Sequence, residues 1–151
     1  MRLRFPLLAA ISLGLALAGC GEHGTPEDEI REVVRIAEES AEARDASRLL
    51  DLIAGDYRDG RGYGAEDVRR LVRGYLLTHQ SIRLLVRIEE IQVKGPDVAR
   101  LRASVGMLGQ ESASDSTWDF VVDVYLFDVM LAREDGEWRV TRAEWNRAVG
   151  G

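Results

Sequence analysis

Hydrophobic residues follow two different periods along this chain, and the change between them separates a helical half from a strand half. Over residues 26–44, apolar side chains recur at the three- and four-residue spacing of one helix face. Thr25-Pro26-Glu27-Asp28 is typical of a helix start, with an N-cap, a proline and acids in the first turn. Two further helices are predicted, one capped by Asp45 and ended by Gly55, and one over 65–78. Three helices therefore precede any strand.

After His79 the period becomes two, which predicts β-strands. The first strand runs to about Val93, a turn follows at 95–97, and the last strand covers 137 to about 146. The second strand is expected to place small and aliphatic residues on its inner face. These residues are Ala99, Leu101, Ala103, Val105 and Met107.

The third predicted strand, over 117–134, contains apolar residues in two different phases. Asp135-Gly136 predicts a two-residue hairpin turn that pairs Leu131 with Val140, so the odd-numbered residues near the turn face the core. The apolar residues at the start of the strand are even-numbered. We therefore expect a bulge between 125 and 128 that changes the phase and curves the sheet.

Three helices followed by four long antiparallel strands indicate an α+β domain. The segments that carry a closer resemblance are 45–50, Tyr57-Arg58-Asp59 and 135–140, whose sequences are Asp-Ala-Ser-Arg-Leu-Leu, Tyr-Arg-Asp and Asp-Gly-Glu-Trp-Arg-Val. In this order the chain resembles the nuclear transport factor 2-like superfamily, which includes ketosteroid isomerase and polyketide cyclases. The resemblance implies three N-terminal helices packed on a curved four-stranded antiparallel sheet, which together enclose a cone-shaped pocket. A cystatin-like or lipocalin-like sheet with fewer helices is the alternative.

The first 19 residues have the pattern of an export signal. Arg2 and Arg4 give a basic start, and the apolar stretch that begins at Phe5 is too short for a membrane-spanning helix of about 20 residues. Leu17-Ala18-Gly19-Cys20 resembles the lipobox of bacterial lipoproteins, in which the chain is cut before the cysteine after its thiol receives a diacylglyceryl group. We therefore expect cleavage between Gly19 and Cys20, and lipid on Cys20.

This pattern divides the chain into a signal peptide (1–19), a lipidated cysteine with a short tether (20–25) and the domain (26–149). Removing the signal leaves 18 basic against 26 acidic residues, so the net charge moves from −6 to −8. A negative protein has little affinity for nucleic acid, and the lipid is the expected membrane attachment. Gly21 stands where an Asp tends to retain lipoproteins in the inner membrane. The predicted location is therefore the periplasmic face of the outer membrane.

Aromatic and titratable residues of the loop, the third helix and the strands are the candidates for lining the implied pocket. They are Tyr57, Tyr63, His79, Trp118, Tyr125, Asp128 and Trp145. Asp128 beside a tyrosine would act as a general base with a phenolic hydrogen-bond donor. Alternatively, the aromatic side chains fill the pocket. His79 and His23 are the only histidines and Cys20 is the only cysteine, so no metal, cofactor or disulfide is expected.

The first interpretation of these observations is a lipoprotein whose non-catalytic domain binds a small apolar ligand or a partner protein of the cell envelope. The alternatives are an enzyme of the isomerase or cyclase type that uses Asp128 and a tyrosine, and a purely structural interaction domain. The outer face of the sheet is expected to be too charged for tight association, so a monomer or a weak dimer is predicted. The charged residues assigned to that face are Arg83, Arg87, Arg100, Arg102, Asp119 and Asp123.

The lipobox generates a direct prediction about Cys20. In a bacterial host, the full chain should incorporate labelled palmitate, because the thiol and the new amino group of Cys20 both receive acyl chains. Cys20→Ala should abolish the label, whereas His23→Ala should retain it. Label that survives Cys20→Ala would contradict the assignment.

Overall fold

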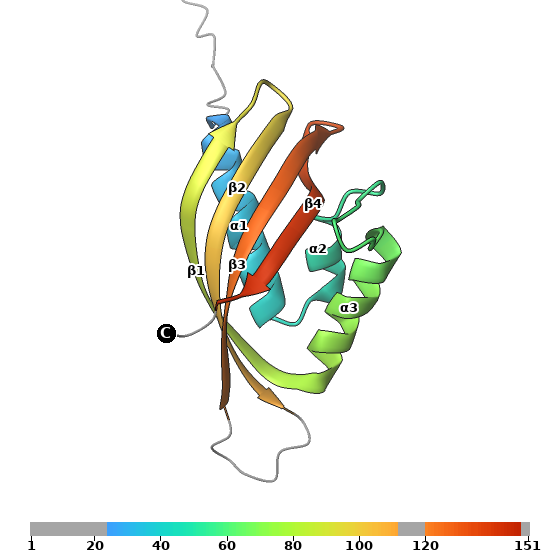
Figure 1. Ribbon diagram of the computed structural model, residues 1–151, viewed down its shortest axis with the longest axis vertical. Coiled ribbons are helices and arrows are strands. Elements are labelled where there is room, and N and C mark those ends of the chain that lie inside the picture. Colours follow the sequence, from blue (N-terminus) through green and yellow to red (C-terminus); the bar gives the residue numbers. More distant parts are fainter. Residues whose placement is uncertain (1–23, 112–119, 149–151) are drawn as a thin grey trace, which may run out of the picture.

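Three helices and four strands follow one another in the predicted order. The computed structural model describes residues 24–111 and 120–148. The elements are α1 (Pro26–Glu42), α2 (Ala46–Leu50), α3 (Ala65–Thr78), β1 (His79–Val93), β2 (Val98–Glu111), β3 (Phe120–Glu134) and β4 (Glu137–Arg147) (Figure 1). The strands form one antiparallel sheet in the order β1-β2-β3-β4. The α+β class and the four-stranded antiparallel sheet are therefore confirmed.

The N-termini of α1 and α2 are capped by the residues that the sequence indicates. Thr25 Oγ1 accepts the N–H of Asp28 (3.2 Å), and the Asp28 carboxylate accepts the N–H of Thr25 (3.2 Å). Asp45 Oδ1 accepts the N–H of Arg48 (3.0 Å). These bonds pair helix-terminal N–H groups that have no partner within the helix.

α1 and α2 both end earlier than predicted. α1 stops before Arg44, which adopts a left-handed φ of 58° and donates to the Leu76 carbonyl (2.7 Å). After α2 the chain pairs with β4, since Val140 donates to the Leu52 carbonyl (2.8 Å) and accepts from the Ala54 N–H (3.0 Å). Leu52 and its neighbours therefore leave the helix to form hydrogen bonds with the edge of β4. Within residues 24–111 and 120–148, no helix is long and apolar enough to cross a membrane.

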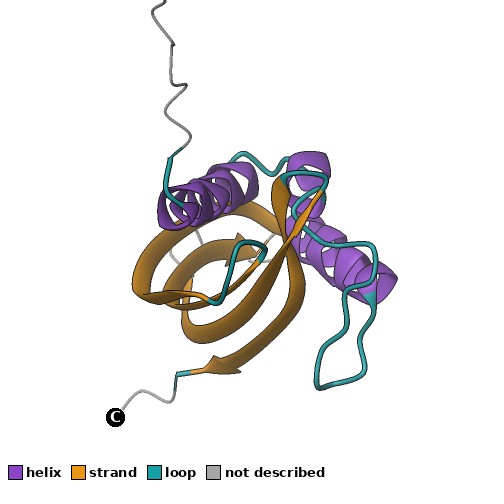
Figure 2. Cartoon of the chain, turned by 90° about the horizontal axis from the view of Figure 1, so that it is seen from above, coloured by secondary structure: helices purple, strands orange, loops and turns teal. Residues whose placement is uncertain are grey.

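The core lies between α1 and the inner face of the sheet, which curls around the helix (Figures 1 and 2). Its buried members are Ile30, Ala99, Leu101, Val129, Leu131 and Trp138. Each large apolar side chain buried here contributes about 1.5–3 kcal/mol. The inner face predicted for the second strand is confirmed at its four positions from Ala99 to Val105, all of which are buried.

The predicted bulge between 125 and 128 is wrong. β3 pairs with β2 without a register shift over residues 120–132. The only register shift between β3 and β4 leaves Thr141 of β4 as the extra residue. Even-numbered residues of β3 therefore face outward, and Val124 and Leu126 are 42% and 52% exposed. The apolar character of this outer face produced the apparent change of phase.

The hairpin between β3 and β4 forms as predicted. Asp135 and Gly136 both have positive φ (50° and 86°), as a type I′ turn requires. Leu131 pairs with Val140, which confirms the predicted register and the inward orientation of Leu131.

The hairpin is joined to α1 by a polar contact at the edge of the core. Glu29 of α1 accepts hydrogen bonds from Trp138 Nε1 (2.7 Å) and from the Arg133 guanidinium (2.6 Å). Arg133 also lies over the Trp138 ring, 4.6 Å from its centroid. The indole N–H is thereby paired at the point where its ring enters the core.

Ser40 of α1 provides a test of the packing. Its side chain is fully buried, and Oγ has no hydrogen-bond partner among the described residues. Because an unpaired buried hydroxyl is destabilising, Ser40→Ala should raise the free energy of unfolding by about 1 kcal/mol. Urea denaturation measures this change.

Ser47→Ala, at an exposed position of α2, is the control for the effect of alanine's helix propensity on the free energy of unfolding. A gain for Ser40→Ala no larger than the gain for Ser47→Ala would contradict the expectation.

Candidate functional site

The structure does not bring the predicted pocket residues together in one site. Tyr57 lies in the loop between α2 and α3, Tyr125 and Trp145 lie on the sheet, and Tyr63 and His79 flank α3. Trp118 and the lipobox residues Leu17 to Cys20 lie outside the described residues.

Tyr57 is a buried structural residue and not a pocket residue. Its hydroxyl accepts the N–H of Ala143 (3.2 Å) and lies 3.2 Å from the carbonyl of the same residue and 3.4 Å from Asp59 Oδ2. The side chain is 1% exposed, and burial raises the pKa of Tyr57 to about 12. A neutral phenol in this position holds the loop against β4.

Asp59 shapes the same loop. Its Oδ1 accepts the N–H groups of Arg61 and Tyr63, both at 2.9 Å. The carboxylate thus closes a turn, as expected for an Asp in such a sequence. The turn delivers Tyr63 to the start of α3.

Asp128 faces outward, which excludes it as the base of an inner pocket. With no bulge before it, Asp128 lies on the opposite face of β3 from Phe127 and Val129. Its carboxylate forms a two-point ion pair with Arg100 of β2. This guanidinium holds the pKa of Asp128 below its usual range. The predicted pairing of Asp128 with a pocket tyrosine is therefore wrong.

The outer face of the sheet carries apolar side chains as well as ion pairs. Exposed aliphatic residues on it are Leu85, Leu108, Val124 and Leu126. Asp123, expected there, instead shares the face of Tyr125 and pairs with Arg147. The outer face therefore combines exposed apolar residues with ion pairs, and the predicted monomer or weak dimer stays a prediction.

Tyr125 and Trp145 belong to an aromatic group on the inner face of the sheet. Phe127 lies between them, with its ring centroid 6.4 Å from Tyr125 and 6.3 Å from Trp145. Arg61 covers the Trp145 ring at 4.4 Å and donates to the Trp145 carbonyl (2.5 Å). Two of the predicted pocket residues, Tyr125 and Trp145, are therefore part of one aromatic cluster that Arg61 of the loop contacts.

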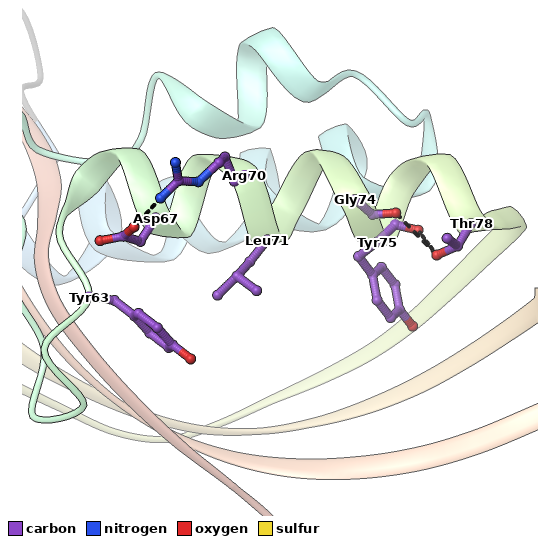
Figure 3. Close-up of a pocket in the computed structure, with 7 residues that line it drawn as sticks. All are labelled: Tyr63, Asp67, Arg70, Leu71, Gly74, Tyr75 and Thr78. Atoms are coloured by element: carbon purple, nitrogen blue, oxygen red, sulfur yellow. Dashed lines mark hydrogen bonds and ion pairs between the residues drawn. The ribbon is translucent and has the colours of Figure 1, made fainter.

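A cleft of about 530 Å³ lies along α3. In Figure 3, the side chains of Tyr63, Leu71 and Tyr75 point from the loop and helix toward the strands. Most of the surface around them is apolar. The complete lining consists of Tyr63, Asp67, Arg70, Leu71, Gly74, Tyr75 and Thr78.

The helical spacing of apolar residues on α3 predicts one buried face, and for two of its members this is wrong. The predicted face consists of Val68, Leu71, Val72, Tyr75 and Leu76. Leu71 is 49% and Tyr75 is 37% exposed. α3 packs mainly against α2 and β1, and Leu76 lies on its buried side. The apolar stripe on α3 is therefore wider than the contact that covers it. Such an excess is the sequence signal that could have located the cleft.

One end of the cleft is charged. Asp67 accepts the N–H of Gly64 (3.0 Å) and forms an ion pair with Arg70. The Gly64 hydrogen bond, followed by Arg70, holds the pKa of Asp67 below its usual range. Asp67 therefore caps α3 as an anion and has little capacity to take a proton.

His79 is not part of this lining, but it follows the lining residue Thr78 directly, where α3 becomes β1. Its ring stacks on Tyr75, with centroids 3.9 Å apart and planes at 20°. Nδ1 lies 2.9 Å from the Tyr75 carbonyl and 3.1 Å from Thr78 Oγ1. A carbonyl only accepts, so Nδ1 carries the proton in the neutral ring, and Nε2 then has the free electron pair.

The described residues contain no cluster of side chains that could bind a metal ion. Among residues 24–111 and 120–148, no three His, Cys, Asp or Glu side chains lie close enough to hold a metal ion.

No protein-family model and no curated protein matches this chain by sequence. Solved structures do match its fold. A protein from Novosphingobium aromaticivorans, provisionally named a scytalone dehydratase, is 13% identical over 82% of this chain and 84% of its own, with a TM-score of 0.73. Hexachlorocyclohexane dehydrochlorinase LinA-type3 from Novosphingobium barchaimii is 15% identical over 82% and 86%, with a TM-score of 0.66. A ketosteroid isomerase-like protein from Erwinia carotovora atroseptica is 13% identical over 84% and 100%, also with a TM-score of 0.66.

These likenesses establish the fold that the sequence suggested, and a further match, a Streptomyces avermitilis protein with a TM-score of 0.69, is described as nuclear transport factor 2-like. The first functional interpretation, a non-catalytic binding domain, is contradicted by two of these matches, which carry the names of a dehydratase and a dehydrochlorinase. At this identity they establish the fold alone, so any activity of this chain has to be argued from its own residues.

Tyr57 generates a prediction about stability at high pH. In the folded protein its pKa is raised from 10.0 to about 12, so the folded state keeps a proton that the unfolded state loses. This contribution to stability is complete below pH 10 and is lost as the pH rises toward 12. Tyr57→Phe should flatten the decline in unfolding free energy in that interval. At neutral pH it should cost about 1–2 kcal/mol, because both polar groups of Ala143 lose their partner.

Tyr63→Phe is the control, since it removes a hydroxyl from an exposed tyrosine of the same loop. Equal pH profiles for Tyr57→Phe and the unmodified protein would refute the structural role of the hydroxyl. Urea denaturation at several pH values gives the measurement.

Proposed function

We propose that this chain is a small-molecule enzyme that removes a proton from carbon and eliminates a leaving group from the neighbouring carbon, with His79 as general base. The observation that carries the proposal is the fixed imidazole of His79, which contacts the cleft residues Tyr75 and Thr78. A hydrogen bond of 2.9 Å to the Tyr75 carbonyl and stacking on the Tyr75 ring determine its orientation and its tautomer.

A general base needs a free electron pair in a defined position. In His79 the bond at Nδ1 leaves Nε2 as the basic atom on the opposite side of the ring. The three carboxylates in or near the predicted site are occupied. Asp59 binds backbone N–H groups, and Asp67 and Asp128 pair with arginines. We therefore favour His79 over these three carboxylates as the general base.

The remaining cleft residues suit a mainly apolar substrate with one polar group. Leu71 and the rings of Tyr63 and Tyr75 supply an apolar wall. The Tyr63 hydroxyl is a donor for a leaving group or a developing oxyanion. No cofactor is needed for such proton transfers.

The names of the matched structures support this reaction class. A dehydratase removes water and a dehydrochlorinase removes hydrogen chloride, so each takes a proton from one carbon and a leaving group from the next. In this chain, Nε2 of His79 would accept the proton while the C–H electron pair forms the double bond. Chloride would leave with the electron pair of the C–Cl bond. A hydroxyl would receive a proton from the Tyr63 hydroxyl and leave as water with the electron pair of the C–O bond.

Attachment to the membrane is a separate proposal. Lipid on Cys20 would place the domain, which starts at Pro26, next to the bilayer at the periplasmic face of the outer membrane. An enzyme at that position would meet apolar compounds that partition into the membrane.

The catalytic proposal is tested with 3-hydroxycyclohexanone and hexachlorocyclohexane as probes. Enone absorbance reports dehydration of the first, and chloride release reports elimination from the second. We expect turnover of at least one probe, and His79→Gln should lower kcat/KM by about 100-fold or more because a positioned base contributes that much. Glutamine keeps a polar side chain of similar length but lacks a basic nitrogen.

Arg73→Gln, an exposed substitution on α3, is the matched control and should leave kcat/KM unchanged. Circular dichroism and thermal melting of each variant establish that it is folded. Turnover of neither probe, or full activity in folded His79→Gln, would refute the proposal.

A further inference from the structure

Gly74 occupies an unfavourable place for a glycine. It lies inside α3 (Ala65–Thr78), with nine residues before it and four after it. Glycine is the weakest helix former after proline, because it loses the most backbone freedom on folding. A glycine at this position weakens the 14-residue helix, and a role that requires the absence of a side chain would account for it.

Close packing against other residues does not explain the glycine at position 74. A Cβ built on Gly74 would meet no heavy atom within 4 Å, apart from its own helix backbone and chain neighbours. No positive φ occurs at Gly74, so its backbone conformation does not require glycine either. Alanine would fit the protein as it stands.

The open space beside Gly74 belongs to the cleft. Arg70 and Leu71 lie one turn before it and Thr78 one turn after it on the same side of α3, and all of them line the cleft with Gly74 (Figure 3). The absent side chain thus leaves a notch between Leu71 and Thr78, beside the Tyr75 ring. Its walls are the Leu71 and Thr78 side chains, the Tyr75 ring and helix backbone.

We propose that Gly74 is a specificity-determining residue, whose notch receives a ring-shaped apolar part of the substrate. This inference rests on the α3 cleft being the active site named under the proposed function. The substrate class that follows is an uncharged cyclic compound, because the two charged residues of the cleft lining, Asp67 and Arg70, neutralise each other in an ion pair. His79 stacks on the Tyr75 ring, which lines the same cleft.

A side chain at position 74 should have opposite effects on stability and binding. Gly74→Ala should raise the thermal midpoint by about 3 °C, because alanine favours the helix and meets no obstacle. It should also weaken binding by about tenfold, because a methyl group then occupies the notch. Gly74→Met, an unbranched helix former with a longer side chain, should weaken binding further.

The experiment measures binding of 1-naphthol to the full chain by amide NMR titration, together with thermal melting. We expect shifts at Leu71, Tyr75 and Thr78 in the unmodified protein, and dissociation constants that rise in the order Gly, Ala, Met at position 74. Arg73→Ala, next to Gly74 but absent from the cleft lining, is the control and should bind like the unmodified protein.

Failure of this inference and failure of the proposed function give different results. No naphthol binding, or equal affinity in the position-74 series, overturns the inference regardless of any activity. Notch-dependent binding together with full activity in folded His79→Gln overturns the catalytic role of His79 and leaves the binding notch supported.

Discussion

The uninterrupted pairing of β2 with β3 is the constraint on which the rest of the structure depends. Side chains of a strand alternate between faces, so one register assigns every residue of β3 to the inside or the outside. It places Leu131 and Val129 against α1, gathers Tyr125 and Phe127 on the inner face, and sends Asp128 out to Arg100. A single extra residue between 125 and 128 would have reversed half of these positions. Because β3 has no such bulge, Tyr125 and Phe127 line the inner face of the sheet and Asp128 does not.

Local signals in the sequence were sufficient for most elements of this fold. Thr25 and Asp45 cap their helices through their own side chains, and the Asp135-Gly136 turn sets a register that needs no distant partner. The same independence explains why α3 was predicted with its observed bounds. The ends of α1 and α2 depend on contacts with α3 and β4, which no local pattern contains.

The candidate site was predicted less well, because alternation and helix spacing report apolar character and not what covers it. Apolar Val124 on the outer face resembled a core residue, and Leu71 resembled a buried helix residue. His79 was among the predicted candidates, but its orientation depends on the Tyr75 carbonyl at the end of α3. The bond between His79 and the Tyr75 carbonyl forms where α3 ends at Thr78 and β1 begins at the next residue.

The contact between the α2–α3 loop and β4 has a consequence for the solubility of the protein. β4 is an edge strand, and a free edge offers unpaired N–H and C=O groups to other chains. Backbone groups of residues 52–58 bind Val140 and Thr141, and the Tyr57 hydroxyl accepts the N–H of Ala143. The loop therefore covers this stretch of the edge without adding a fifth strand. A segment that orients Arg61 and Tyr63 also protects the sheet from edge-to-edge aggregation.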